Sequence, residues 1–284
     1  MAKLLCFPLK LQELDYATAF AEIVVNENLR HLDFADIPNS VRVVIIENLS
    51  KFSQLKSLTL RNYAQAAGQW LYKDTLQSMQ KGIYGLTSLC LFSLKNGCTN
   101  EILTSICLNC RWTLEIIDIE SSKQVSDACI PYLLMCIKVT ELNLFRTGLT
   151  DEGKGILISK LPKLSHLPRG DFLCDALAWI EEEDDGPECI FSIREFFPSQ
   201  KYYFHEDWQM EMVASCCPYI SKMFFIYHEQ CVPDYLVLLP FANITDLDLY
   251  GGHYYDDKIC DLLQIRGEGI SKLRLISVKG IDYK

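Results

Sequence analysis

The sequence lacks a surplus of basic residues. Its 284 residues contain 27 Lys and Arg against 37 Asp and Glu, which gives a formal net charge of −10 and a pI near 5.0. Proteins that bind nucleic acid or anionic membranes make their phosphate contacts through Lys and Arg. The composition therefore argues against both kinds of binding and favours partners with basic character.

Long apolar runs are missing as well. Tyr235–Ala242 is among the longest, and it falls far short of the roughly 20 apolar residues of a membrane-spanning helix. Near the N-terminus, Lys10, Glu13 and Asp15 interrupt the apolar stretch, which does not fit a secretory signal. We therefore expect no membrane contact and a cytoplasmic location, with a nuclear one left open.

The cysteines follow no disulfide or zinc pattern. There are thirteen, an odd number, and they are scattered along the chain. Cys107-Leu108-Asn109-Cys110 is a single C-x-x-C pair, whereas a structural zinc site needs four ligands. We predict reduced, structural thiols with no disulfides and no bound metal.

Patterns that would indicate catalysis are also missing. The five His form no metal-binding pair and no nucleophile–base arrangement. The segment from Gly148 to Gly155 resembles a phosphate-binding loop, but Gly155 stands where that loop needs Ser or Thr to hold magnesium. We predict that the protein is not an enzyme and uses no cofactor.

What the sequence does contain is a recurring apolar pattern. Its clearest copy begins Val139-x-x-Leu142-x-Leu144, continues through a turn and a helical segment, and starts again at Leu164. Such a unit of strand, turn and helix is a leucine-rich repeat, and stacked copies bury one another's apolar faces. The pattern occurs ten times, at intervals of 24 to 31 residues. The copies begin at Leu29, Leu55, Leu86, Leu114, Val139, Leu164, Ile193, Ile220, Ile244 and Ile270.

This period predicts an α/β fold: a leucine-rich repeat solenoid, or right-handed α/β horseshoe, with parallel strands on the concave side and helices on the convex side. A single array of about ten repeats is expected over residues 1–284. An acidic loop near 181–188 is expected to interrupt it, after a helix at 171–180. Helix N-caps are predicted at Thr99, Ser126 and Thr150.

Two elements of the repeat resemble the cysteine-containing, ribonuclease-inhibitor-like subclass of leucine-rich repeat proteins. Val125-Ser126-Asp127 and Leu149-Thr150-Asp151 match the turn before the helix in that subclass. Cys217-Pro218-Tyr219-Ile220 matches its junction between helix and next strand. The resemblance covers roughly residues 86–167 and the chain from Cys216 onward.

Members of this subclass are intracellular binding scaffolds, and many are substrate receptors of cullin-type (SCF) ubiquitin ligases, attached through an N-terminal F-box. The resemblance thus implies protein recognition, most specifically as such a receptor with ligase components among its partners. Only 28 residues precede Leu29, and no F-box pattern is found in them. An adaptor or regulatory binding protein without ligase association is therefore the alternative.

The strand period also predicts which residues face the concave surface. In each Leu-x-x-Leu-x-Leu pattern, they are the residues before and after the second (central) leucine and the residue after the third. Acids and aromatics recur there, as in protein interfaces. Asp118, Glu120, Glu141 and Phe145 are expected at equivalent positions of consecutive repeats, which would place three carboxylates beside one aromatic ring. This cluster, and a second one around Tyr250, would suit an incoming Arg or Lys. The alternative is that the acids only keep the surface soluble. The predicted partner-binding residues are Phe92, Asp118, Glu120, Glu141, Phe145, Phe224, Asp246, Asp248 and Tyr250.

Overall fold

The structure of the 284-residue chain is a computed structural model that describes residues 28–35, 48, 51–52, 54–61, 84–90, 98–170, 172–183, 190–197, 207–227, 235–251 and 256–277. In this part of the chain, a short strand lies on each of the ten predicted copies of the repeat. Their bounds are β1 (His31–Ala35), β2 (Ser57–Arg61), β3 (Ser88–Cys90), β4 (Ile116–Asp118), β5 (Glu141–Asn143), β6 (His166–Leu167), β7 (Glu195–Phe196), β8 (Lys222–Tyr227), β9 (Asp246–Gly251) and β10 (Lys272–Ile276).

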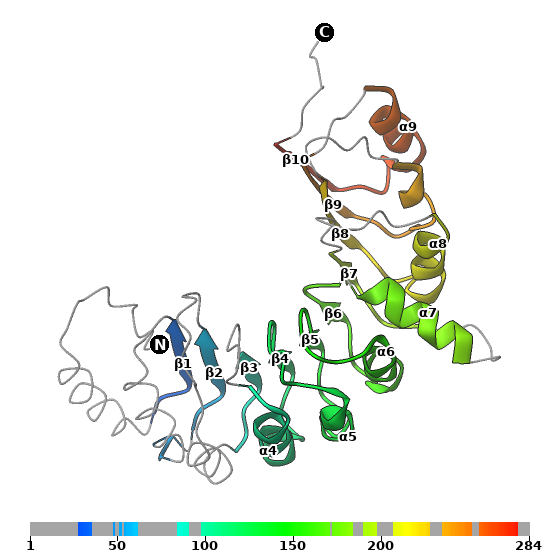
Figure 1. The fold of residues 1–284 in the computed structure, drawn as a ribbon. Coiled ribbons are helices and arrows are strands. Elements are labelled where there is room, and N and C mark those ends of the chain that lie inside the picture. Colours follow the sequence, from blue (N-terminus) through cyan, green and yellow to red (C-terminus); the bar gives the residue numbers. More distant parts are fainter. Residues whose placement is uncertain are drawn as a thin grey trace. The chain divides into compact units, whose positions relative to one another are not determined.

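The strands form one open, parallel sheet whose order follows the sequence from β1 to β10 (Figure 1). Equivalent residues of successive repeats are register partners, as Leu58, Leu89, Ile117 and Leu142 show. These four side chains are at most 1% exposed. They form one continuous row of core residues, because each repeat covers the apolar face of its neighbour. The predicted fold class, an α/β leucine-rich repeat solenoid, is confirmed.

The chain divides into two compact units. Unit 1 comprises residues 1–150 and 160–163, and unit 2 comprises 151–159 and 164–284. Strands β1–β5 belong to unit 1 and strands β6–β10 to unit 2. Within each unit the helices lie on one side of the strands (Figure 1), so the opposite side is called the sheet face below. The single array over 1–284 stays a prediction.

Helical segments connect the strands. None of those in the described part of the chain combines the length and the hydropathy that a membrane span requires. Their bounds are α4 (Asn100–Cys110), η2 (Asp127–Cys129), α5 (Ile130–Leu133), α6 (Asp151–Lys160), α7 (Leu173–Glu183), α8 (Asp207–Cys216), η3 (Tyr235–Leu238) and α9 (Asp256–Arg266).

Helix α4 begins at its predicted cap. The Thr99 hydroxyl accepts a hydrogen bond from the Ile102 backbone N–H at 3.5 Å, which satisfies one of the free donors of the first turn. Glu101 lies in the same turn, and its hydrogen bond with the Thr99 side chain lowers the pKa of its carboxyl group. The stability that this carboxylate contributes is therefore lost as the pH falls through its folded pKa.

Ser126 stands at the predicted N-cap position with an extended backbone, but its side chain does not cap the helix. Its hydroxyl makes no cap hydrogen bond and instead accepts one from Asn100 Nδ2 at 2.7 Å, while its backbone N–H donates to Asn100 Oδ1 at 2.8 Å. One repeat further on, Thr150 donates to Asp127 twice, through its backbone N–H at 3.0 Å and its hydroxyl at 2.7 Å. The polar residues of this turn thus connect neighbouring repeats.

The predicted acidic loop begins later than expected. Helix α7 continues through Glu183, so the first three glutamates of the acidic run belong to the helix. Residues 184–188 of the predicted loop lie outside the described residues.

Candidate partner-binding face

The register of β4 and β5 corrects one detail of the first predicted cluster. Asp118 pairs with Asn143, and Glu141 pairs with Ile116. The prediction that Asp118 and Glu141 occupy equivalent positions is therefore wrong. Asp118 follows the central apolar residue of its strand, whereas Glu141 precedes the central apolar residue of the next strand. Residues at one repeat position form a row across the strands, called a strand row below. The two carboxylates belong to different strand rows of the same face, in unit 1.

Glu120 is the most buried acid of the cluster. It is 8% exposed, and its Oε2 accepts a hydrogen bond from Asn143 Nδ2 at 3.0 Å. Asn143 is itself 4% exposed, and its Oδ1 accepts from the Phe145 backbone N–H at 3.2 Å. Part of the Glu120 carboxylate thus serves to join two repeats, and less of it is available to a partner.

Asp118 lies half-buried between β3 and the turn after β4. Its Oδ2 accepts a hydrogen bond from the Cys90 thiol at 3.5 Å, and its Oδ1 accepts from the Glu120 backbone N–H at 3.1 Å. Two donors from different elements therefore hold the carboxylate in place on the sheet face. A carboxylate has about four lone-pair positions, so Asp118 can accept further hydrogen bonds from a ligand.

Phe145 already contacts a cation of its own chain. The Arg146 guanidinium carbon lies 4.9 Å from the centre of the Phe145 ring. Arg146 adopts a positive φ of 55°, and the Phe145 carbonyl accepts a 2.8 Å hydrogen bond from Ser121, whose φ is also positive at 62°. A cationic group from a partner would have to use the part of the ring that Arg146 leaves exposed, or replace Arg146.

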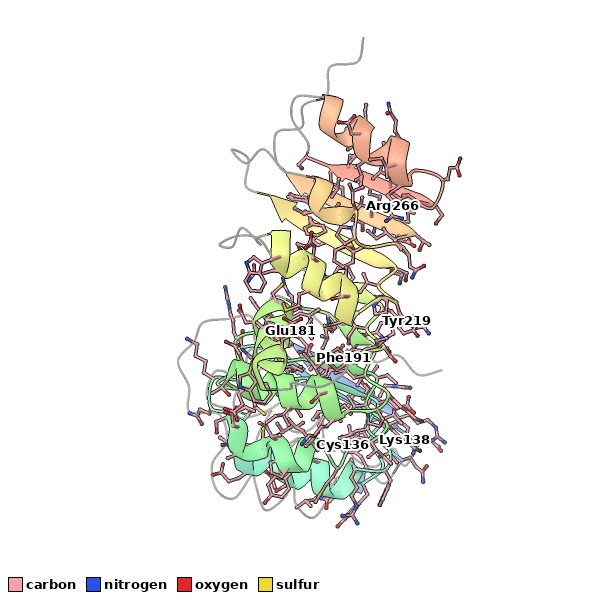
Figure 2. The ribbon with its side chains drawn as sticks, turned by 90° about the vertical axis from the view of Figure 1, so that its right-hand side faces the viewer. Cys136, Lys138, Glu181, Phe191, Tyr219 and Arg266 are labelled. Carbon is pink, nitrogen blue, oxygen red and sulfur yellow. The ribbon has the colours of Figure 1, made fainter. Side chains whose placement is uncertain are left out.

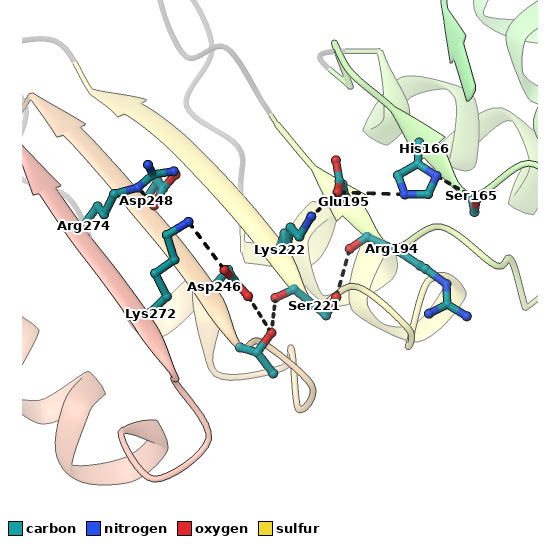
Figure 3. A network of polar contacts seen from close by, with 11 residues as sticks. Ser165, His166, Arg194, Glu195, Ser221, Lys222, Asp246, Asp248, Lys272 and Arg274 are labelled. Atoms are coloured by element: carbon teal, nitrogen blue, oxygen red, sulfur yellow. Dashed lines mark hydrogen bonds and ion pairs between the residues drawn. The ribbon is translucent and has the colours of Figure 1, made fainter. Parts of the chain in front are cut away.

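The second predicted cluster lies in unit 2 and has cations of its own. His166, Glu195, Lys222, Asp246 and Lys272 are successive register partners across five strands. Lys222 Nζ lies 2.7 Å from Glu195 Oε1, and Lys272 Nζ lies 3.8 Å from Asp246 Oδ1 (Figure 3). The hydrogen bond with Glu195 raises the pKa of Lys222. Charges of alternating sign thus form a row across the sheet face.

Asp248 has a cationic partner on the neighbouring strand. Arg274 Nε donates to Asp248 Oδ1 at 2.7 Å, and a second guanidinium nitrogen donates to Oδ2, which makes a two-point contact. This contact raises the pKa of Arg274. A basic segment would have to replace Arg274 at Asp248, so this cluster does not offer the same chemistry as the one in unit 1.

The aromatic residues of the face differ in exposure. Phe224 is half-buried and contacts Phe197 edge to face, with ring centres 6.2 Å apart. Tyr250 is 41% exposed. Phe92, the remaining predicted site residue, lies outside the described residues.

The basic residues that pair with the acids of unit 2 were not among the predicted site residues. Lys222, Lys272 and Arg274 stand at positions of the repeat equivalent to those of Asp246 and Asp248. The alternation of charge at one repeat position was the signal that could have revealed the row.

The glycine-rich segment at the start of α6 is used for packing. A Cβ at Gly148 would lie 2.6 Å from the Lys123 carbonyl oxygen, so glycine is required by close backbone approach. Lys154 forms a 2.8 Å ion pair with Asp151 one turn earlier. The lysine that a phosphate loop would use is therefore paired within its own helix.

Most of the ten described cysteines are buried. Burial raises the pKa of Cys98, Cys129 and Cys174 to about 12. These thiols stay protonated at neutral pH, which suits core packing rather than metal binding or nucleophilic attack. Among the described residues, no group of three or more His, Cys, Asp or Glu could hold a metal ion.

Comparison with known proteins finds no matching family model and no matching curated protein. Among solved structures, the chain is similar to one in the crystal structure of the Rad7 and Elc1 complex of yeast, with TM-score 0.45, 12% identity, and coverage of 85% of this chain and 67% of that chain. It is also similar to a leucine-rich repeat protein of Leptospira interrogans, with TM-score 0.43, 13% identity, and coverage of 91% and 69%. At these TM-scores neither likeness carries an argument, and the fold assignment rests on the repeat geometry itself.

Proposed function

We propose that the protein is a non-enzymatic recognition scaffold, and that the sheet face of unit 1 binds a protein segment with basic character. The supporting observation is a difference in formal charge between the two faces, counted by strand position. In unit 1, four acids stand against one cation, a formal charge of −3: Asp33, Asp118, Glu120 and Glu141 against Arg61. In unit 2, three acids stand against three cations: Glu195, Asp246 and Asp248 against Lys222, Lys272 and Arg274.

The unit 1 face offers both parts of a site for a basic side chain. Asp118 and Glu141 supply carboxylates that can form charge-assisted hydrogen bonds with Arg or Lys. Ile116 and Phe145 are half-buried on the same face and can cover the aliphatic stem of that side chain. A segment with two or more basic residues would bind more firmly than a single cation, because it would contact both strand rows.

Within this class, the more specific proposal is a substrate receptor of a cullin-type ubiquitin ligase, located in the cytoplasm or the nucleus. It is supported by the matches of Val125-Ser126-Asp127 and Cys217-Pro218-Tyr219-Ile220 to the cysteine-containing subclass. The second candidate is an adaptor or regulator without ligase association, which needs only the binding face.

Quantitative mass spectrometry of proteins co-purified from cells tests the proposal. Asp118→Asn combined with Glu141→Gln should lose the partner that binds the unit 1 face. The matched control is Glu181→Gln combined with Glu211→Gln, which removes two exposed acids from helices of unit 2 and should retain it. A cullin and its linker protein among the retained partners would support the ligase role, and a stable non-ligase partner would support the adaptor.

A second measurement examines the mechanism with the purified partner. The affinity of wild type should fall as salt increases, since exposed charge pairs are screened. The Asp118 and Glu141 double variant should bind more weakly and show a flatter salt dependence. Equal affinity of the two proteins at low salt, with both folded, would exclude the unit 1 sheet face as the site.

A further inference from the structure

Large apolar side chains are exposed at one repeated position of unit 1. Tyr84 is 62% exposed, Trp112 is 60% exposed and Ile137 is 44% exposed. Each stands two residues before the first buried apolar residue of its repeat. Single exposed apolar residues are normal on protein surfaces, but here the same position is exposed in three consecutive repeats, which places these residues in one row.

Backbone hydrogen bonds hold this row in order. Thr87 N–H donates to the Lys56 carbonyl, Glu115 N–H to the Thr87 carbonyl and Thr140 N–H to the Glu115 carbonyl, each at 2.8 Å. These bonds align the starts of β3, β4 and β5, and adjacent strands lie about 4.8 Å apart. The residues just before the strand starts therefore lie side by side along the edge of the sheet where the strands begin.

The same edge is basic in a chain that is acidic overall. Five repeats have their strands in unit 1. From three positions before to one position after the first apolar residue of each, the sequence contains four cations and two acids: Arg30, Lys56, Arg111, Lys138, Glu27 and Glu115. The Arg111 guanidinium carbon lies 5.3 Å from the centre of the Trp112 ring. Figure 2 shows Lys138 near the margin of the ribbon, with Cys136 further inside.

We propose that this strand-start edge, formed by Tyr84, Arg111, Trp112, Ile137 and Lys138, is a second protein-binding surface, and that its occupant is a short acidic segment with apolar side chains. The apolar row needs a partner that covers it, since contiguous exposed apolar surface marks interaction sites. Carboxylates of the partner would form charge-assisted hydrogen bonds with the cations beside the row. The surface differs in position and charge from the unit 1 sheet face, so the inference is independent of the function proposed above.

The net charge decides between a short acidic segment and a larger polyanion. A charge interaction is largely screened beyond about 8 Å at physiological ionic strength, so a short peptide on this edge responds mainly to the local cations. A nucleic acid or an anionic membrane extends well past the edge and meets a molecule with a formal charge of −10. Binding of a protein segment is therefore favoured.

Selection from a displayed library of short random peptides, with the intact protein as bait, tests the inference. Peptides that combine Asp or Glu with Leu, Phe or Trp should be enriched. Fluorescence polarisation of the best labelled peptide should show roughly tenfold weaker binding to Trp112→Ala and to Lys138→Glu. Double-stranded DNA and phosphatidylserine vesicles, measured alongside, should bind more weakly than the peptide.

Matched variants control for effects unrelated to the edge. Trp208→Ala removes a tryptophan that is 49% exposed in unit 2, and Lys123→Glu reverses an exposed charge elsewhere in unit 1. Both should bind the peptide as wild type does. The inference is overturned if no acidic, apolar peptide is enriched, if the enriched peptides bind the edge variants unchanged, or if DNA or vesicles bind to this edge and the peptides do not.

Discussion

Removal of the Asn143 amide should show how far a buried polar contact supports the proposed binding face. Asn143→Ala deletes the hydrogen bond to the Glu120 carboxylate and the acceptor of the Phe145 backbone N–H. Both side chains are buried, so water does not easily replace these bonds. A hydrogen bond to a charged group contributes more than a neutral one, and a donor left buried without a partner adds to the loss, which together gives about 2–4 kcal/mol. Denaturant unfolding followed by circular dichroism measures this loss of stability.

A carboxylate at the same position gives the sharper result. Asn143→Asp places a second acid beside Glu120 without changing the size of the side chain, and the two negative charges repel each other. Its deficit in unfolding free energy relative to wild type should be larger at pH 7 than near pH 4.5, because protonation of one carboxyl group relieves the repulsion. Asn243→Ala, which removes an exposed amide bonded to the Pro218 carbonyl at 2.7 Å, should cost far less. The reasoning is refuted if Asn143→Ala loses no more stability than Asn243→Ala, or if the Asn143→Asp deficit does not depend on pH.

The remaining predictions concern packing, binding and the thiols. Gly148→Ala should lose about 1–3 kcal/mol of unfolding free energy, because the added Cβ meets backbone oxygens. In the control Gly269→Ala, the Cβ makes ordinary contacts at 3.5 Å and 3.8 Å, and the unfolding free energy should change by less than about 0.5 kcal/mol. Equal losses would show that the backbone at Gly148 can shift. Phe145→Ala should weaken binding of the identified partner by about 1–3 kcal/mol with little change in salt dependence, and a flattened salt dependence in isothermal titration would contradict an apolar role. Iodoacetamide at pH 8 should label exposed Cys260 before buried Cys98, as read by peptide mass spectrometry. Because burial raises the pKa of Cys98 to about 12, the unfolded chain releases thiol protons that the native state retains, so unfolding free energy should decrease as the pH rises above about 8.5.

The fold could be predicted from the sequence because it depends on a short-range pattern that repeats. Leu89, Leu114 and Leu144 are fully buried at the positions that the apolar period assigns to the core. A strand has only two faces, so the same period also assigned residues such as Asp118 and Tyr250 to the sheet face. Stacking of equivalent repeats then leaves little freedom in the order of the strands.

The tertiary structure alone decided which polar groups are used inside the protein. Ser126 has the sequence context of a helix cap, yet its side chain bonds to Asn100, 26 residues earlier in the chain. Glu120 is an acid on the predicted binding face, but contact with Asn143 on the next repeat leaves it 8% exposed. Asp248 is likewise engaged by Arg274. The physical reason is that the burial of a residue follows from the local apolar period. These hydrogen bonds and ion pairs instead require two side chains from different repeats to come within about 3 Å of each other. Only the packed register of the repeats brings them there.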